Sequence, residues 1–200
     1  MIGLFSDSDL FEGKNQFVDF SFPDAEIKLW EQFFSRKEAD SYYKTLLHDT
    51  PWSQHRRKMY DKIVPDPRLT AWYGKEGTNE WTNELLEIKS KVEDTIGVQF
   101  DGVLLNYYRD GNDSVSWHSD NLPPDGKGTP IASVTFGATR IFKIRHKTRK
   151  DIRPLGILLT HGSLLLMGET MQQNYEHHIS KTAQKVGPRI NLTFRMKDSE

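Results

Sequence analysis

The stretch SVSWHSDN, residues 114–121, places His118 and Asp120 two positions apart. Side chains at positions i and i+2 of a β-strand lie on the same face. If this stretch forms a strand, the imidazole and the carboxylate point the same way and can bind one metal ion, while Val115 and Trp117 point to the other side and can enter a core. His-x-Asp pairs often arise by chance, so the pair indicates a metal site only if a third ligand exists. The alternative is a surface strand on which the two residues are simply neighbours.

Two histidines and one carboxylate on one side of a metal form the facial triad of non-haem Fe(II) oxygenases, which leaves positions open for a cosubstrate and dioxygen. Four histidines follow the His-x-Asp pair. His146 lies in a basic run, where we expect a solvated side chain. His161 precedes Gly162 at a predicted turn, where we expect a structural role. His177 and His178 lie in the strand-like stretch NYEHHIS, and either of them can be the third ligand.

The stretch PRINLTFR, residues 188–195, predicts a strand whose two faces differ. The apolar row is Ile190, Leu192 and Phe194, and the polar row is Arg189, Asn191, Thr193 and Arg195. Arginines that face the inside of a barrel are costly unless they are paired. A dicarboxylate ligand would offset that cost, because a guanidinium binds a carboxylate in bidentate geometry. The alternative is an edge strand with solvent-facing arginines.

A further polar pair precedes the metal-binding candidates. In VQFDGVLLNYY, Asn106 and Tyr108 share one strand face, and both can donate hydrogen bonds to an acidic ligand. The segment RDGND that follows is a turn signal. We therefore predict a hairpin in which this strand pairs with the strand that carries His118 and Asp120.

Length and composition limit the class of protein. The 200 residues suit one domain with a substantial core, and 36% hydrophobic and 12% aromatic residues indicate a soluble globular chain. Because there is no cysteine, disulfides, zinc ribbons, iron–sulfur clusters and thiol nucleophiles are excluded. A formal net charge of -1 does not by itself indicate a nucleic-acid partner, so such a partner must be inferred from local patches.

Targeting signals are not evident. No apolar run approaches the roughly 20 residues that span a membrane. The start, MIGLFSDSDLFEGKNQF, lacks the pattern of a signal peptide. We therefore expect a cytoplasmic protein, or a nuclear one in a eukaryote, that is not secreted, has no membrane partner and is a monomer.

The N-terminal part predicts a leader followed by a strand and a helix. Residues 1–23 have little periodicity and are expected to form a poorly specified leader. AEIKLWEQFF then reads as a strand, because apolar and charged residues alternate. Ser35 and Glu38 have the spacing of a capping box, which predicts the start of a helix that Pro51 ends.

A second helix is predicted over TNEWTNELLEIKSKVEDTIG, residues 78–97, with Gly97 as its C-terminal stop. Between the helices, residues 52–78 are aromatic, basic and rich in Pro and Gly, which predicts strands and loops. After the second helix the chain consists of short apolar runs broken by turn residues, such as LGILLTHGSLLLMG. This pattern predicts a β-sandwich, barrel or jelly roll against which the helices pack.

Five stretches taken together resemble one family: NYYRDGNDSVSWHSDN, PIASVTFGATRIFKIRHK, THGSLLLMG, NYEHHIS and PRINLTFR. In order and spacing they are similar to the AlkB-type Fe(II)/2-oxoglutarate dioxygenases, which oxidatively demethylate alkylated nucleic-acid bases. The resemblance is dense over residues 102–196 and extends loosely through FFSRKEADSYYKTLLHDTPW and PRLTAWYG toward residue 32. It implies a mainly β fold with N-terminal helices. Residues 98–200 would form a double-stranded β-helix, or jelly roll, and residues 24–97 would add helices and a nucleotide-contacting lid to the same domain.

The resemblance also implies a cofactor and two cosubstrates. The implied ligands of Fe(II) are His118, Asp120 and His177. The implied contacts of the cosubstrate 2-oxoglutarate are Asn106, Tyr108, Arg189, Asn191 and Arg195, with Arg189 on the distal carboxylate. His177 is preferred to His178 because the family pattern, aromatic-x-His-x-aliphatic, is matched by Tyr175 and Ile179. Dioxygen is the second cosubstrate.

On the substrate side, the resemblance implies 1-methyladenine and 3-methylcytosine in DNA, with RNA as a further candidate, and release of formaldehyde. The residues predicted to contact the substrate are Trp72, Tyr73, Arg140 and Leu122. Leu122 stands two positions after the aspartate ligand, where family members often have an acidic residue that faces the base. A hydroxylase of the same fold that acts on a protein or a small molecule is the alternative function.

Two basic segments are candidates for phosphate contacts. HRRK spans residues 55–58, and KIRHKTRKDIR spans residues 143–153. Phosphates need cationic partners, and a base-modifying enzyme must take the target base out of the stack. The alternative for both segments is a solvated basic surface.

Overall fold

Two antiparallel β-sheets form the body of the protein. The structure is a computed structural model, which describes residues 16–20, 22–59, 61–75, 77–121 and 128–196. The larger sheet contains, in spatial order, β1 (Val18–Asp19), β2 (Ile27–Trp30), β11 (Ser163–Met167), β8 (Ile131–Gly137), β13 (Arg189–Arg195), β6 (Gly102–Tyr108) and β5 (Leu69–Gly74). The smaller sheet contains β10 (Leu155–Leu159), β9 (Arg140–His146), β12 (Tyr175–Ile179) and β7 (Val115–His118). A separate hairpin consists of β3 (Arg56–Met59) and β4 (Lys62–Pro65).

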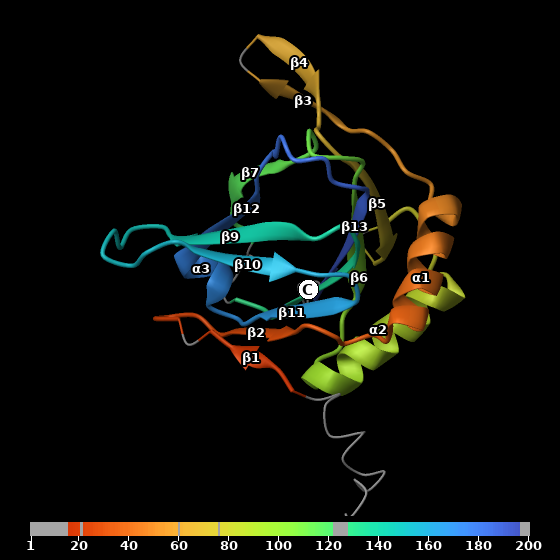
Figure 1. Ribbon diagram of the computed structural model, residues 1–200, viewed down its shortest axis with the longest axis horizontal. Coiled ribbons are helices and arrows are strands. Elements are labelled where there is room, and N and C mark those ends of the chain that lie inside the picture. Colours follow the sequence, from red (N-terminus) through yellow and green to blue (C-terminus); the bar gives the residue numbers. More distant parts are fainter. Residues whose placement is uncertain (1–15, 21, 60, 76, 122–127, 197–200) are drawn as a thin grey trace, which may run out of the picture.

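The chain passes back and forth between the two sheets from β6 onward (Figure 1). Strands β6, β8, β11 and β13 belong to the larger sheet, and β7, β9, β10 and β12 belong to the smaller one. This winding is that of a jelly roll, so the predicted fold class is confirmed. The N-terminal segment adds β1 and β2 at one edge of the larger sheet and β5 at the other.

The predicted hairpin of β6 and β7 is wrong. β6 pairs with β13 and β5 in the larger sheet, whereas β7 pairs with β12 in the smaller one. The RDGND segment therefore crosses between the sheets. Burial explains the difference, because β6 is buried at almost every position, as a strand between two neighbours must be, while β7 is a half-exposed edge strand.

Two hydrophobic cores lie on the two sides of the larger sheet. The outer core packs this sheet against the helices and includes Ile190, Leu192 and Phe194 of β13. The inner core lies between the sheets and includes Phe142, Ile144, Ile157, Leu159, Leu165 and Met167. Full burial of such side chains contributes roughly 1.5–3 kcal/mol each. The alternation predicted for PRINLTFR is confirmed, since its apolar row is in the outer core and its polar row lines a cavity between the sheets.

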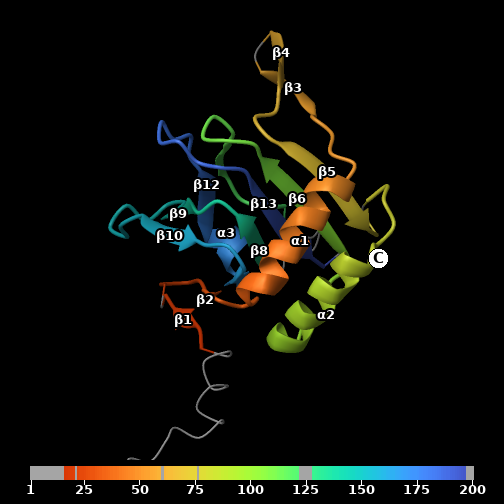
Figure 2. The same ribbon diagram turned by 45° about the vertical axis from the view of Figure 1, so that its right-hand side comes forward.

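Helices α1 (Arg36–Asp49) and α2 (Asn83–Ile96) lie side by side against the larger sheet (Figure 2). The predicted capping box of α1 is present: Glu38 N–H donates to Ser35 Oγ at 3.3 Å, and Ser35 N–H donates to Glu38 Oε2 at 2.7 Å. Neither helix exceeds 14 residues, and in the described part of the chain no helix has the length and apolar character needed to cross a membrane.

The second helix is shorter than predicted. It begins at Asn83 rather than at residue 78, because the Thr82 side chain caps it by accepting the Leu85 N–H at 3.3 Å. It ends at Gly97, as predicted, where φ is 75° and a residue without Cβ is favoured. The sequence did not predict the one-turn helix α3 (Met171–Asn174) between β11 and β12.

The segment expected to form the lid, residues 52–78, divides into two parts. The β3–β4 hairpin projects from the body, whereas β5 joins the larger sheet beside β6 (Figure 1). The loop between them is tied to the start of β7, because Ser114 N–H donates to the Pro67 carbonyl at 2.9 Å. Within the predicted leader, Val18–Asp19 pairs with β2, while residues 1–15 lie outside the described residues.

The capping box is expected to make a pH-dependent contribution to stability. Hydrogen bonds from Ser35 hold the pKa of Glu38 at about 2, below its ordinary value of 4.5. Because the folded-state pKa is depressed, this contribution is complete above the unfolded-state pKa and is lost as the pH falls toward 2. Glu38→Gln should therefore lower the free energy of unfolding by about 0.5 kcal/mol at pH 7 and by less at pH 3.5.

Urea unfolding of wild type and Glu38→Gln at both pH values measures this effect, with Glu80→Gln as a control at an exposed position. A difference of the same size at pH 7 and pH 3.5 would contradict the assignment.

Candidate metal and cosubstrate site

A cavity of about 250 Å³ lies between the two sheets. Its lining includes the three predicted iron ligands, His118, Asp120 and His177. It also includes the five predicted 2-oxoglutarate contacts, Asn106, Tyr108, Arg189, Asn191 and Arg195. The apolar part of the lining comprises Leu104, Val115, Phe142, Met167 and Ile179. The fold therefore brings the two predicted sets, which are spread over 90 residues of sequence from Asn106 to Arg195, to one place.

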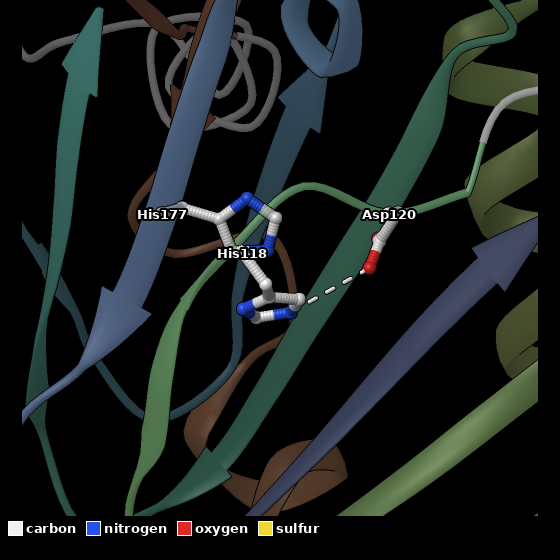
Figure 3. A group of neighbouring side chains, drawn as sticks. All are labelled: His118, Asp120 and His177. Carbon is white, nitrogen blue, oxygen red and sulfur yellow. Dashed lines mark ion pairs between the residues drawn. The ribbon is translucent and has the colours of Figure 1, made fainter. Parts of the chain in front are cut away.

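His118, Asp120 and His177 form a compact cluster in this cavity (Figure 3). Each offers one ligand atom, and these atoms all lie within 4.8 Å of one another. His118 ends β7 and lies opposite His177 of β12, with the ring centroids 4.3 Å apart. Asp120 reaches the cluster from the loop after β7 rather than from the strand itself. Two imidazoles and one carboxylate are the donor set of the Fe(II) facial triad.

A β-bulge in β7 turns His118 into the cavity. The register of β7 against β12 shifts between Val115 and His118, so β7 has one residue more than β12 in this interval. As a result Val115 and His118 both line the cavity, while Trp117 stacks on the ring of His178. The expectation that Trp117 enters a core is therefore wrong.

The surroundings of the two imidazoles suit metal binding. His118 Nδ1 lies 2.8 Å from the Ser116 carbonyl oxygen, which can only accept a hydrogen bond. In the neutral ring the proton is therefore on Nδ1, and Nε2, which is 3.7 Å from Asp120 Oδ1, has a free lone pair. Burial lowers the pKa of His177 to about 4, so its imidazole is neutral at pH 7.

Asp120 is held from two sides. Its backbone N–H donates to Gln172 Oε1 at 2.9 Å, and its Oδ1 forms an ion pair with Arg195 Nη2 at 2.9 Å. The Arg195 guanidinium also lies 5.4 Å from the centre of the Trp72 ring, within cation–π range. Gln172, in α3, carries no signal in the sequence because its role depends on a helix that the sequence did not predict.

Arg189 is almost completely buried, with 1% of its surface exposed. Its Nη2 donates to Thr135 Oγ1 at 2.9 Å, whereas Nε and Nη1 have no hydrogen-bond partner among the described residues. Burial lowers the pKa of Arg189 to about 10, so the guanidinium remains charged at pH 7. A buried cation with unused donors calls for an anion, and a carboxylate fits two guanidinium donors at once. The residues present therefore fit the distal carboxylate of 2-oxoglutarate.

The two asparagines of the site differ in their hydrogen bonds. Asn106 Oδ1 accepts from Arg68 Nε at 2.8 Å, which leaves the donor group of this amide for a ligand. Asn191 Nδ2 donates to Ser133 Oγ at 2.8 Å and to the Val134 carbonyl at 3.0 Å. Asn191 therefore lines the cavity, but its amide group donates its hydrogen bonds to other residues of the protein.

Arg68, which also lines the cavity, was missed by sequence reasoning. The sequence feature that could have indicated this position is a positively charged residue directly before the strand LTAWYG.

The predicted aromatic contacts of the substrate lie on opposite faces of β5. Trp72 is half-buried on the side of Arg195. Tyr73 is 2% exposed and belongs to the outer core, so the structure corrects the prediction that it contacts the substrate. The reason is strand alternation, which directs neighbouring side chains to opposite faces.

Of the other two predicted substrate contacts, Arg140 is absent from the described lining of the cavity. Arg140 is buried, and its guanidinium donates to the carbonyls of Asp110, Asp113 and Ser180. These bonds fasten the β6–β7 connection to the end of β12, so the structure corrects a substrate role to a structural one. Leu122 lies outside the described residues.

His161 and His146 both have structural surroundings. His161 has the expected role, because its Nδ1 accepts the Gly137 N–H at 2.8 Å and its Nε2 lies 3.2 Å from Asp40 of α1. The expectation of a solvated His146 is wrong: this side chain is buried, and its Nδ1 accepts the backbone N–H groups of Thr148 and Arg149.

One of the two basic segments is partly neutralised. In KIRHKTRKDIR, Arg145 pairs with Glu176 at 2.7 Å and Arg149 pairs with Asp151 at 2.8 Å. The HRRK segment contributes to the β3–β4 hairpin. The exposure of individual lysines and arginines therefore does not by itself mark a phosphate site.

Known proteins are similar to this chain in sequence and in fold. The model of the 2OG-Fe(II) oxygenase superfamily matches residues 26–195. The chain is 39% identical over 180 residues to "Alpha-ketoglutarate-dependent dioxygenase alkB homolog 3" of Bos taurus, which covers 82% of this chain and 63% of that protein. It is 31% identical over 182 residues to "DNA oxidative demethylase ALKBH2" of Mus musculus, which covers 81% of this chain and 76% of that protein.

The chain thus spans 63% of the length of the bovine relative. One similar solved structure is titled "The structure of OsALKBH1". The match has a TM-score of 0.66 at 16% identity and covers 88% of this chain and 99% of that chain, so the two proteins share the fold. The site agrees with these matches, because it holds a His-Asp-His cluster beside a buried arginine. The chain therefore belongs to the 2OG-Fe(II) oxygenase superfamily and, within it, to the AlkB-type dioxygenases.

Proposed function

We propose that this chain removes methyl groups from bases of the 1-methyladenine and 3-methylcytosine type in DNA by Fe(II)- and 2-oxoglutarate-dependent oxidation. We propose further that it acts as a monomer in the cytoplasm or the nucleus. The observation that carries the chemistry is one cavity that holds both the His118–Asp120–His177 cluster and the unpartnered donors of buried Arg189. Support for the substrate comes from the relatives, one of which is named a DNA oxidative demethylase.

Each residue of the site has a defined task in this proposal. His118, Asp120 and His177 would hold Fe(II), and Arg195 keeps the Asp120 carboxylate in place by its ion pair. Arg189 would bind the distal carboxylate of 2-oxoglutarate, with Tyr108 and the Asn106 amide beside it. When bound, iron, 2-oxoglutarate and dioxygen supply the oxidation of an N-methyl group, which leaves as formaldehyde while 2-oxoglutarate becomes succinate and CO2. The surrounding apolar side chains exclude water from this chemistry.

The described lining of the cavity contains one carboxylate, that of the proposed ligand Asp120, and three arginines, Arg68, Arg189 and Arg195. Asn121 also lines it and offers a neutral amide. A methylated base that carries a positive charge would therefore depend on bound 2-oxoglutarate to balance the arginines.

The alternative function, hydroxylation of a protein or a small molecule by the same site, differs in its dependence on nucleic acid. The purified chain is incubated with Fe(II), 2-oxoglutarate and oligonucleotides that are methylated or unmethylated, as DNA or as RNA, and formaldehyde and succinate are measured. Formaldehyde should appear only with methylated oligonucleotides, should vanish with EDTA and should return with Fe(II). An equal yield of succinate with and without a methylated oligonucleotide would rule out the proposed substrate class.

The choice of third ligand is tested by two neighbouring substitutions. His177→Ala should reduce Fe(II) affinity and demethylation at least tenfold, because it removes one of three ligands. His178→Phe is the matched control, since His178 lies on the opposite face of β12 against Trp117. Phenylalanine keeps a ring there but cannot ligate a metal, so this variant should retain most of both. Calorimetric titration with Fe(II) under anaerobic conditions measures the affinity, and the reverse pattern would move the ligand by one residue.

The role of Arg189 is tested by Arg189→Lys and Arg189→Ala. A lysine keeps the charge but loses the bidentate geometry, so the KM for 2-oxoglutarate should rise in Lys and more steeply in Ala, while the affinity for Fe(II) should stay near the wild-type value. Steady-state kinetics at saturating oligonucleotide measures the KM. A KM unchanged in both variants would remove Arg189 from the cosubstrate site.

A further inference from the structure

The strand that carries His118 is poorly held by its backbone. β7 has four residues and is the edge strand of the smaller sheet, and among the described strands it pairs with β12 alone. The bulge between Val115 and His118 interrupts even this pairing. A bulged edge strand has few ladder hydrogen bonds to fix it, so something else must hold the His118 ring in place.

A stack of side chains covers the back of this strand. The Trp117 ring lies on the His178 ring with the centroids 3.9 Å apart and the planes 22° from parallel. The Arg145 guanidinium lies 4.2 Å from the centre of the Trp117 ring, and it is fixed by two hydrogen bonds to Glu176 Oε2 at 2.9 and 2.7 Å. These four residues belong to β7, β12 and β9, so the stack ties three adjacent strands together on the outer face of the sheet.

The stack sits directly behind the proposed metal ligands. Trp117 precedes His118, and His178 follows His177. Because neighbouring residues of a strand point to opposite faces, the outer rings stack while the inner imidazoles face each other at 4.3 Å. Fixing Trp117 against His178 therefore fixes the separation and the direction of the two imidazoles in the cavity.

We propose that Trp117 is a positioning residue of the metal site, which acts through His118 and is held by His178 and by the Arg145–Glu176 pair. This inference rests on the proposed iron site and not on the nucleic-acid substrate. It also explains why a large aromatic ring remains half-exposed on an edge strand, where it adds nothing to either hydrophobic core.

The test is an anaerobic calorimetric titration of the full chain with Fe(II) alone, without oligonucleotide. Trp117→Ala should weaken Fe(II) binding about tenfold, the scale of a residue that orients a metal ligand. Trp117→Phe keeps an aromatic ring for the stack and should stay close to wild type. Leu158→Ala, at an exposed position of β10 in the same sheet, is the matched control and should leave the affinity unchanged.

A second readout separates positioning from general stability. At saturating Fe(II), the KM of Trp117→Ala for 2-oxoglutarate should remain near the wild-type value, because Arg189 lies in the other sheet. Wild-type affinity for Fe(II) in folded Trp117→Ala, as judged by circular dichroism, would overturn the proposal. If Trp117→Ala does not fold, Arg145→Gln decides instead: it should weaken Fe(II) binding severalfold, and an unchanged affinity would overturn the proposal equally.

Discussion

The charge of Arg189, enclosed between two β-sheets, is the constraint that organises the inside of this protein. A guanidinium in such a place is costly unless its donors are used. Thr135 meets one donor, and the polar residues around it satisfy one another: Asn191 donates to Ser133, and Thr193 donates to Asn191. The inner faces of β8 and β13 thereby form a closed polar network in which, among the described residues, the remaining donors of Arg189 have no protein partner. A cosubstrate with a terminal carboxylate is the natural complement of that arrangement.

The two halves of the site are built by different means. The anion-binding half is carried by β6, β8 and β13, which lie beside one another in the larger sheet and are buried almost throughout. The metal-binding half is carried by the end of an edge strand, a loop and β12 in the smaller sheet. Rigid scaffolding therefore surrounds the carboxylate site, whereas the ligand cluster depends on side-chain contacts such as those of Arg195 and Gln172 with Asp120.

Part of this could be predicted from the sequence, because β13 follows a strict period of two and the helix ends carry local signals. The alternation in PRINLTFR separated the polar row of β13 from its apolar row correctly, and the capping box and Gly97 marked a helix start and a helix end. The same period implies that Trp72 and Tyr73 face opposite sides of β5, and treating them as a pair was the mistake.

The errors share one physical cause, which is that partners distant in sequence decide a residue's surroundings. RDGND looks like a hairpin turn, but β6 is buried almost throughout and pairs with β13 and β5 in the larger sheet, away from β7. Arg140 was predicted to contact the substrate, but its guanidinium donates to three backbone carbonyls from two loops. The bulge in β7 has no local signature either, since it exists only in the register against β12.

The position of β13 has a consequence for how the chain folds. This strand follows all the other described strands in sequence, yet it lies between β8 and β6 in the middle of the larger sheet. Until β13 is synthesised, β8 and β6 lack their common neighbour, and the larger sheet is not continuous. Such long-range pairing makes folding slow and exposes strand edges during translation. The outer core, the continuity of the larger sheet and the anion site therefore all depend on the last described strand of the chain, and none of the three is complete until that strand is in place.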